Sequence, residues 1–81
     1  MTFSLLWSTK PRKFVERLPP QDAQRLFRKF DEIKEDPFRF AKHYEGPCFK
    51  IRIGDFRALI DIDVHKNLIE VQHIEKRENI Y

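Results

Sequence analysis

The chain of 81 residues contains a single cysteine, Cys48, and its longest apolar runs are only a few residues long. One cysteine excludes a disulfide within the chain and is typical of proteins that work in a reducing compartment. The apolar runs fall far short of the roughly 20 residues that a membrane helix needs, and the N-terminus lacks the charged-then-apolar layout of a secretory leader. We therefore expect a cytoplasmic protein without a membrane segment.

The sequence also lacks metal-ligand spacing, internal repeats and low-complexity segments. His43, His65 and His73 share no ligand spacing with one another or with Cys48, so we expect neither a metal site nor a cofactor. Cys48 has no paired base in the sequence pattern and is expected to be incidental rather than nucleophilic. Residues 1–81 are expected to form one domain.

The composition is that of a small globular protein with a moderate excess of positive charge. Hydrophobic residues make up 41% of the chain and include eight phenylalanines, which favours a packed core although 36% of the residues are charged. The net charge is only +3, because 13 acidic residues dilute 16 basic ones. A nucleic-acid-binding function must therefore rest on where the cations cluster.

Hydrophobic periodicity predicts a strand and two helices in the first half of the chain. Residues 2–8 alternate as a strand, and a short helix is expected to begin after Ser8 or Thr9. From about Pro20 to Glu35, apolar residues recur at three- and four-residue spacing, which indicates an amphipathic helix.

The second half is predicted to supply three more strands. Residues 38–47 have no regular period and are predicted to be a connection, residues 48–62 alternate as a hairpin, and residues 68–76 form the last strand. The apolar residues of that last strand change parity, so a β-bulge is expected near Gln72 or His73.

These elements predict an α+β fold. Each strand offers one apolar face and each helix one apolar stripe, so the two helices are expected to pack on one face of a four-stranded, mostly antiparallel sheet. The other sheet face is then open to solvent.

The segment 49–57 carries the most informative pattern in the chain. Its apolar residues alternate with Lys50 and Arg52, and Gly54-Asp55 has the glycine-first order of a type II′ turn. That turn places Arg52 directly opposite Arg57 on the open face, where like charges cost stability. The hairpin has only one acidic residue on that face, Asp61, and it lies farther along the strand. A polyanionic ligand therefore explains the Arg52–Arg57 pair better than a contribution to folding does.

Three motifs follow one another in this half of the sequence. They read Phe49-Lys50-Ile51-Arg52-Ile53, then Gly54-Asp55-Phe56-Arg57, then Ile74-Glu75-Lys76-Arg77-Glu78-Asn79-Ile80-Tyr81. Together they resemble the RelE/ParE superfamily of toxins from toxin-antitoxin pairs. Its members typically show an aromatic-basic-hydrophobic-basic-hydrophobic strand, a Gly-Asp-aromatic-Arg turn and a hydrophobic-x-x-Arg-x-x-x-Tyr ending. The order of strands and helices also matches, so the resemblance covers nearly the whole chain.

The resemblance implies the toxin of a type II toxin-antitoxin system. RelE-like members are metal-independent endoribonucleases that cleave mRNA in the ribosomal A site, by attack of a ribose 2′-hydroxyl on the adjacent phosphate, and so inhibit translation. The implied partners are a RelB-like antitoxin and ribosome-bound mRNA.

The resemblance also implies a set of site residues. The catalytic candidates are Lys50, Arg52, Arg57, Arg77 and Tyr81, with Lys42 and Lys76 as RNA-binding candidates. By the resemblance, Arg57 and Arg77 brace the scissile phosphate, for which the guanidinium fork is suited. Lys50 and Arg52 are expected to position the phosphate and take part in proton transfer. Tyr81 is expected to act as a base or to stack on a nucleobase.

Two other functions remain open from the sequence. One is a non-catalytic binding module, either a ParE-type inhibitor of DNA gyrase or a relative that only binds its antitoxin. The other is a free RNA-binding domain without an antitoxin. The four cations at positions 50, 52, 57 and 77 favour the nuclease, because gyrase inhibitors need not retain them.

Several side chains outside these motifs are assigned by spacing. Trp7, Phe27 and Phe30 are predicted to lie in the core. Tyr44 is predicted to cover one end of the sheet or to belong to a patch that a partner buries. His73 is predicted to be structural or partly exposed, with a general base as the alternative.

Overall fold

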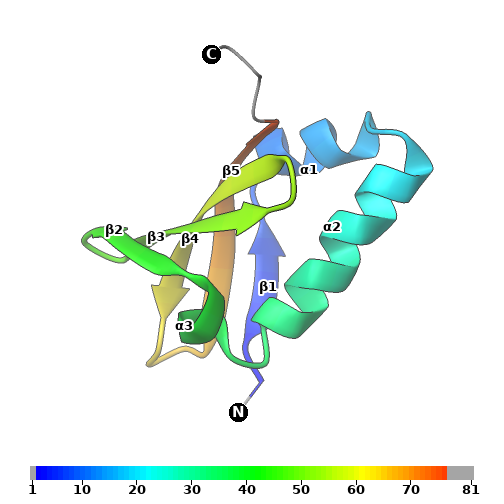
Figure 1. The fold of residues 1–81 in the computed structure, drawn as a ribbon. Coiled ribbons are helices and arrows are strands. Elements are labelled where there is room, and N and C mark those ends of the chain that lie inside the picture. Colours follow the sequence, from blue (N-terminus) through cyan, green and yellow to red (C-terminus); the bar gives the residue numbers. More distant parts are fainter. Residues whose placement is uncertain (1, 77–81) are drawn as a thin grey trace.

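The computed structural model describes residues 2–76, in which two helices pack on one face of a five-stranded sheet (Figure 1). In chain order the elements are β1 (Ser4–Trp7), α1 (Thr9–Glu16), α2 (Pro20–Ile33), α3 (Pro37–Phe40), β2 (Lys42–Glu45), β3 (Cys48–Ile53), β4 (Phe56–Asp63) and β5 (Leu68–Lys76). The sheet order is β1-β5-β4-β3-β2, with β1 parallel to β5 and the other neighbours antiparallel. The predicted α+β fold, with helices on a mostly antiparallel sheet, is confirmed.

The described sheet has one strand more than the four predicted. The additional strand, β2, lies within residues 38–47, which were predicted to be an irregular connection, and the single helical turn α3 precedes it. All four β2 residues are exposed and show no apolar alternation, so the sequence carries no strand signal there. The strand forms at the sheet edge by pairing with β3, and its register breaks between His43 and Glu45.

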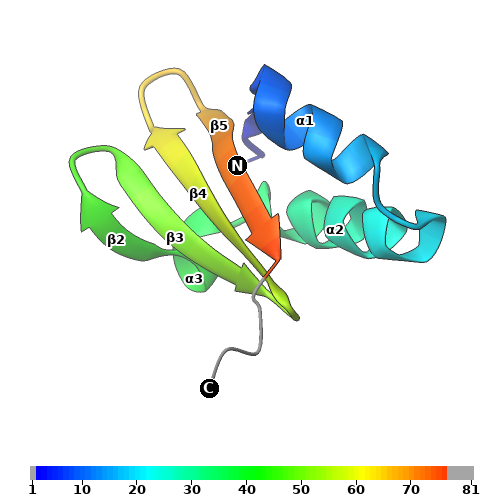
Figure 2. The same ribbon diagram turned by 90° about the horizontal axis from the view of Figure 1, so that it is seen from above.

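The core lies between the helices and the sheet face that they cover (Figure 2). Helix α1 contributes Val15, and α2 contributes Leu26, Phe30 and Ile33, each at most 1% exposed. The alternating residues of β3, β4 and β5 that meet these helices are Ile51, Ile53, Phe56, Ala58, Ile60, Ile62, Ile69, Val71 and Ile74. Burying one face of these strands leaves the opposite face to the polar residues between them.

Two of the three predicted core aromatics pack as expected. Phe30 is fully buried, and the half-buried Trp7 ring meets it edge to face at a centroid distance of 5.0 Å. The prediction for Phe27 was wrong, because this side chain is 48% exposed. It lies at the margin of the α2 stripe, where its ring meets the Trp7 ring in an edge-to-face arrangement at a centroid distance of 5.7 Å.

The hairpin between β3 and β4 has the register that its turn predicts. Ile53 pairs with Phe56, and Arg52 pairs with Arg57. In a type II′ turn the first central residue has a positive φ and the second does not. Gly54 has φ +56° and Asp55 does not have a positive φ, so the turn meets both conditions. A two-residue turn therefore fixes which side chains share the open face.

The predicted bulge in β5 is also present. Leu59 pairs with His73 and Ile60 pairs with Val71, so Gln72 is the extra residue. The Gln72 side chain donates a hydrogen bond to Asp61 Oδ2 at 3.1 Å. Because of this bulge, the residues after it change parity, and the buried residues on both sides of it face the same core.

Candidate functional site

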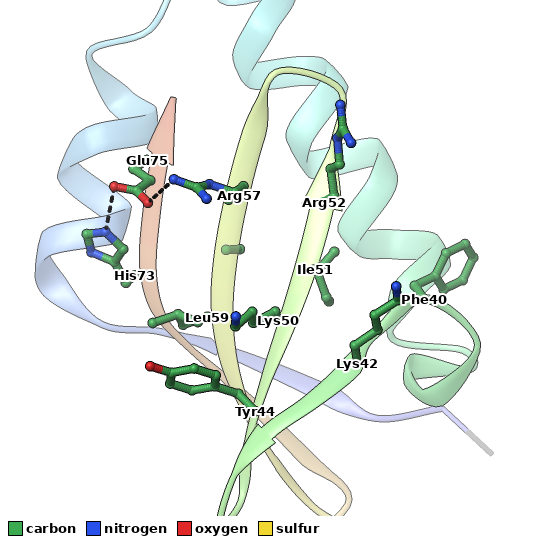
Figure 3. Close-up of a pocket in the computed structure, with 11 residues that line it drawn as sticks. Phe40, Lys42, Tyr44, Lys50, Ile51, Arg52, Arg57, Leu59, His73 and Glu75 are labelled. Carbon is green, nitrogen blue, oxygen red and sulfur yellow. Dashed lines mark hydrogen bonds and ion pairs between the residues drawn. The ribbon is translucent and has the colours of Figure 1, made fainter. Parts of the chain in front are cut away.

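A groove of about 410 Å³ lies on the open face of the sheet, over strands β2 to β5 (Figure 3). Four cations line it, together with one carboxylate, one imidazole and the ring of Tyr44. The four cations are Lys42, Lys50, Arg52 and Arg57. Each of them was a candidate from the sequence, and the fold brings all four to one surface.

Strand register explains how the cations gather. Lys42 on β2 pairs with Lys50 on β3, and Arg52 on β3 pairs with Arg57 on β4. Like charges placed opposite each other are unfavourable in an isolated sheet. All four side chains are exposed, so the groove combines a concentrated positive charge with free access for an anion.

Glu75 on β5 changes the predicted electrostatics of the arginine pair. Arg57 Nη2 donates a hydrogen bond to Glu75 Oε1 at 3.0 Å, so Arg57 is compensated from outside its own hairpin. The expectation had weighed only the acidic residues of that hairpin, and the pairing of β5 with β4 brings in another. Both side chains are about half exposed, and such a surface pair contributes only about 0.2–1 kcal/mol. A phosphate can therefore displace the carboxylate at small cost.

His73 lies on the other side of the Glu75 carboxylate. Its Nε2 is 3.6 Å from Glu75 Oε2, and Figure 3 shows the carboxylate between the imidazole and the Arg57 guanidinium. Both residues reach the open face because the bulge at Gln72 resets the parity of β5. Glu75 was not predicted as a site residue, although the predicted bulge already places it on the open face.

Lys50 is held by an aromatic ring from the edge strand. Its Nζ lies 4.5 Å from the centroid of the Tyr44 ring, a cation–π geometry. Tyr44 is 50% exposed and lines the groove rather than the core. Its role depends on β2, which the sequence did not predict as a strand.

The remaining candidates are not part of this groove. Lys76 pairs with Phe56, whose ring faces the helices, so the register places it on the opposite side of the sheet from Arg57. Lys76 is exposed and is not among the groove residues. Arg77 and Tyr81 lie outside the described residues, and the roles that the resemblance implies for them remain predictions.

Cys48, the first residue of β3, is partly buried. Burial raises the pKa of its thiol, the carboxylates of Asp61 and Glu45 raise it further, and the Lys50 ammonium acts in the opposite direction. A raised pKa leaves less thiolate at neutral pH, which agrees with an incidental cysteine rather than a nucleophile.

Within residues 2–76, no helix combines the length and apolar character needed to cross a bilayer. In that part of the chain, no three side chains of His, Cys, Asp or Glu gather in the way a metal site requires.

Solved structures with a similar fold are RelE toxins and their complexes. A chain of the RelBE2 toxin-antitoxin complex from Mycobacterium tuberculosis is 21% identical, with a TM-score of 0.86 over 95% of this chain and 100% of that one. A chain of the archaeal RelE-RelB complex from Pyrococcus horikoshii OT3 is 18% identical, with a TM-score of 0.81 over 98% and 99%. The isolated E. coli RelE toxin is 20% identical, with a TM-score of 0.80 over 95% and 86%.

The sequence comparisons give no further assignment: no protein-family profile matches the chain, and no curated protein matches it significantly. At the identities above, the structural likeness establishes the fold. The molecule is a small α+β domain with one sheet face open and cationic, and its fold is that of the RelE toxins. The resemblance stated from the sequence motifs is confirmed at this level.

Proposed function

We propose that this chain is the toxin of a type II toxin-antitoxin system and acts in the cytoplasm as a ribosome-dependent mRNA endonuclease. The observation that carries the proposal is the gathering of Lys42, Lys50, Arg52 and Arg57 in one groove on the open face of a RelE fold. A RelB-like antitoxin is the proposed neutralising partner, as in the complexes that share this fold.

The proposed reaction is attack of a ribose 2′-hydroxyl on the adjacent phosphate. Negative charge develops on the non-bridging oxygens in the transition state, and fixed cationic donors stabilise it there. The Arg57 and Arg52 guanidiniums supply donors in a planar fork, and the Lys50 ammonium adds a point charge beside them. These groups supply the positive charge that a metal ion supplies in many other nucleases.

The C-terminal candidates complete the proposal. Arg77 is proposed to brace the phosphate with Arg57, and Tyr81 to act as a base or to stack on a nucleobase. Lys76 is proposed as an RNA contact outside the groove, since the sheet separates its side chain from Arg57.

One observation favours a second candidate, a binding module without catalysis. The Glu75 carboxylate accepts a hydrogen bond from Arg57 Nη2 at 3.0 Å and so takes up a donor that a phosphate would need. A chain whose arginine is permanently held in this way would engage an antitoxin or gyrase and cleave nothing.

Induced expression in bacteria separates these functions. Primer extension on cellular messages is expected to show codon-phased cuts during growth arrest, and Arg57→Ala is expected to abolish both. Arg28→Ala serves as the matched control, because Arg28 is exposed on α2, away from the groove. Arrest with intact messages and blocked DNA supercoiling would instead support gyrase inhibition. Absence of arrest with retained antitoxin binding would support the inactive relative.

A further inference from the structure

Two titratable groove residues, His73 and Glu75, have no part in the proposed function as stated above. Both are exposed on the open face, His73 opposite Leu59 and Glu75 opposite Arg57. Histidine is the one side chain that ordinarily changes charge between pH 5 and 8, which suits it to proton transfer. The cations of the groove are suited to binding an anion, but lysine and arginine side chains are ordinarily protonated at neutral pH and so cannot accept a proton.

The side chains of Arg57, Glu75 and His73 form a line across strands β4 and β5. Arg57 Nη2 is 3.0 Å from Glu75 Oε1, and Glu75 Oε2 is 3.6 Å from His73 Nε2. One carboxylate thus separates the imidazole from the guanidinium proposed to hold the phosphate (Figure 3). An imidazole backed by a carboxylate is an arrangement in which the carboxylate selects the tautomer and the second ring nitrogen accepts a proton.

We propose that His73 is the general base of the RNA cleavage, which leaves Tyr81 the stacking role, and that Glu75 positions His73; this inference rests on the proposed function. In the proposed catalytic geometry the neutral imidazole donates a hydrogen bond from Nε2 to Glu75, for which their 3.6 Å separation in the free protein must shorten, and Nδ1 is then left as the proton acceptor. The proposal requires Nδ1 to reach the ribose 2′-hydroxyl beside the phosphate that Arg57 binds, and both His73 and Arg57 line the same groove.

The step balances without any further reactant. Nδ1 of His73 takes the proton of the ribose 2′-hydroxyl as that oxygen forms a bond to phosphorus. The bond from phosphorus to the 5′-oxygen breaks, and this leaving oxygen takes a proton from the Lys50 ammonium. The products are a 2′,3′-cyclic phosphate and a 5′-hydroxyl, and exchange with water restores neutral His73 and charged Lys50.

Substrate binding strengthens the proposed role of Glu75. In the free protein this carboxylate is shared between Arg57 at hydrogen-bond distance and His73 at a longer one. When a phosphate oxygen takes the Arg57 donors, the carboxylate is released toward the imidazole. Glu75 also competes with the substrate phosphate for Arg57. Removing the Glu75 charge is therefore expected to tighten substrate binding and to slow the chemical step.

The pH dependence expected for RNA cleavage depends on His73 and on the charged groups around it. The groups that share its groove are Glu75 on β5, Arg57 on β4, Lys50 and Arg52 on β3, and Lys42 and Tyr44 on β2. Only Glu75 among them is within ion-pair distance of the imidazole in the described residues. Activity is therefore expected to fall as pH decreases and the imidazole takes up a proton.

The test measures cleavage of mRNA on programmed ribosomes by the purified full chain, as a single-turnover rate and a half-saturating toxin concentration across pH. His73→Gln is expected to lower the rate at least about 100-fold and to remove the acidic limb of its pH profile. His65→Gln, in the turn between β4 and β5, is the control and is expected to leave both unchanged. Glu75→Gln is expected to lower the rate and also lower the half-saturating concentration, by about two- to fivefold.

The outcomes separate this inference from the proposed function. Cleavage by His73→Gln at the wild-type rate, with an unchanged acidic limb, overturns the general base and leaves the nuclease standing. A Glu75→Gln variant that binds more tightly but cleaves at the wild-type rate overturns the positioning role. Absence of cleavage by the wild-type chain on ribosomes overturns the nuclease and the general base together.

Discussion

The Lys50 ammonium lies 4.5 Å from the centroid of the Tyr44 ring. This contact joins the edge strand β2 to the cationic hairpin, since Tyr44 belongs to the strand that pairs with β3. It holds a long, exposed side chain over the groove before any anion arrives. Lysine side chains otherwise lose considerable conformational freedom on binding, so this contact is expected to lower the entropic cost of engaging the phosphate of the proposed RNA substrate.

Replacing Tyr44 should weaken RNA binding in proportion to the loss of this contact. Tyr44→Ala is expected to raise the dissociation constant for a single-stranded RNA with a 2′-deoxy scissile position about two- to fivefold, since an exposed cation–π contact contributes about 0.5–1 kcal/mol. Fluorescence anisotropy at fixed salt measures the change. Tyr44→Phe keeps the ring and is expected to bind like the wild type; equal weakening by Phe and Ala would show that the hydroxyl group, and not the ring, matters.

The hairpin turn should depend on the glycine at position 54. Gly54 has φ +56°, and a Cβ there would meet only the Arg25 side chain at 3.8 Å, so backbone conformation and not crowding sets the cost. Gly54→Ala is expected to lower the free energy of unfolding by about 1–2 kcal/mol, as measured by urea denaturation. Gly54→Asn is expected to cost less, because asparagine tolerates this region better.

The neighbouring turn residue provides the control for that measurement. Asp55 does not have a positive φ, so Asp55→Ala should change stability less than Gly54→Ala does. A Gly54→Ala protein as stable as the wild type would show that the turn changes conformation readily.

How much of the site could be predicted depends on whether local or distant pairing creates it. The opposition of Arg52 and Arg57 follows from a two-residue turn, so nine consecutive residues contain all the information. Strand β2 has no pattern of its own and forms only because β3 offers an edge. The ion pair of Glu75 with Arg57 needs the β4–β5 register, which a bulge shifts by one residue.

The reactivity of Cys48 should follow its electrostatic surroundings. Burial and the carboxylates of Asp61 and Glu45 raise the pKa of this thiol, and the Lys50 ammonium lowers it. Because the thiolate is the reacting form, iodoacetamide at pH 8 should modify folded Cys48 more slowly than the unfolded chain. Asp61→Asn is expected to increase the rate and Lys50→Met to decrease it; equal rates in both variants would contradict this account.

Deleting Gln72 should be tolerated, because it removes the extra residue of the bulge and leaves a regular strand. Val71 and His73 already pair with the adjacent residues Ile60 and Leu59, so every remaining β5 side chain keeps its face. The free energy of unfolding is expected to change by about 1 kcal/mol or less. Deleting Ala58 from β4, which has no extra residue, should instead expel Phe56 or Ile60 from the core and cost about 3–5 kcal/mol. Denaturant unfolding of both variants measures the contrast, and equal losses would mean that the bulge is required for the fold.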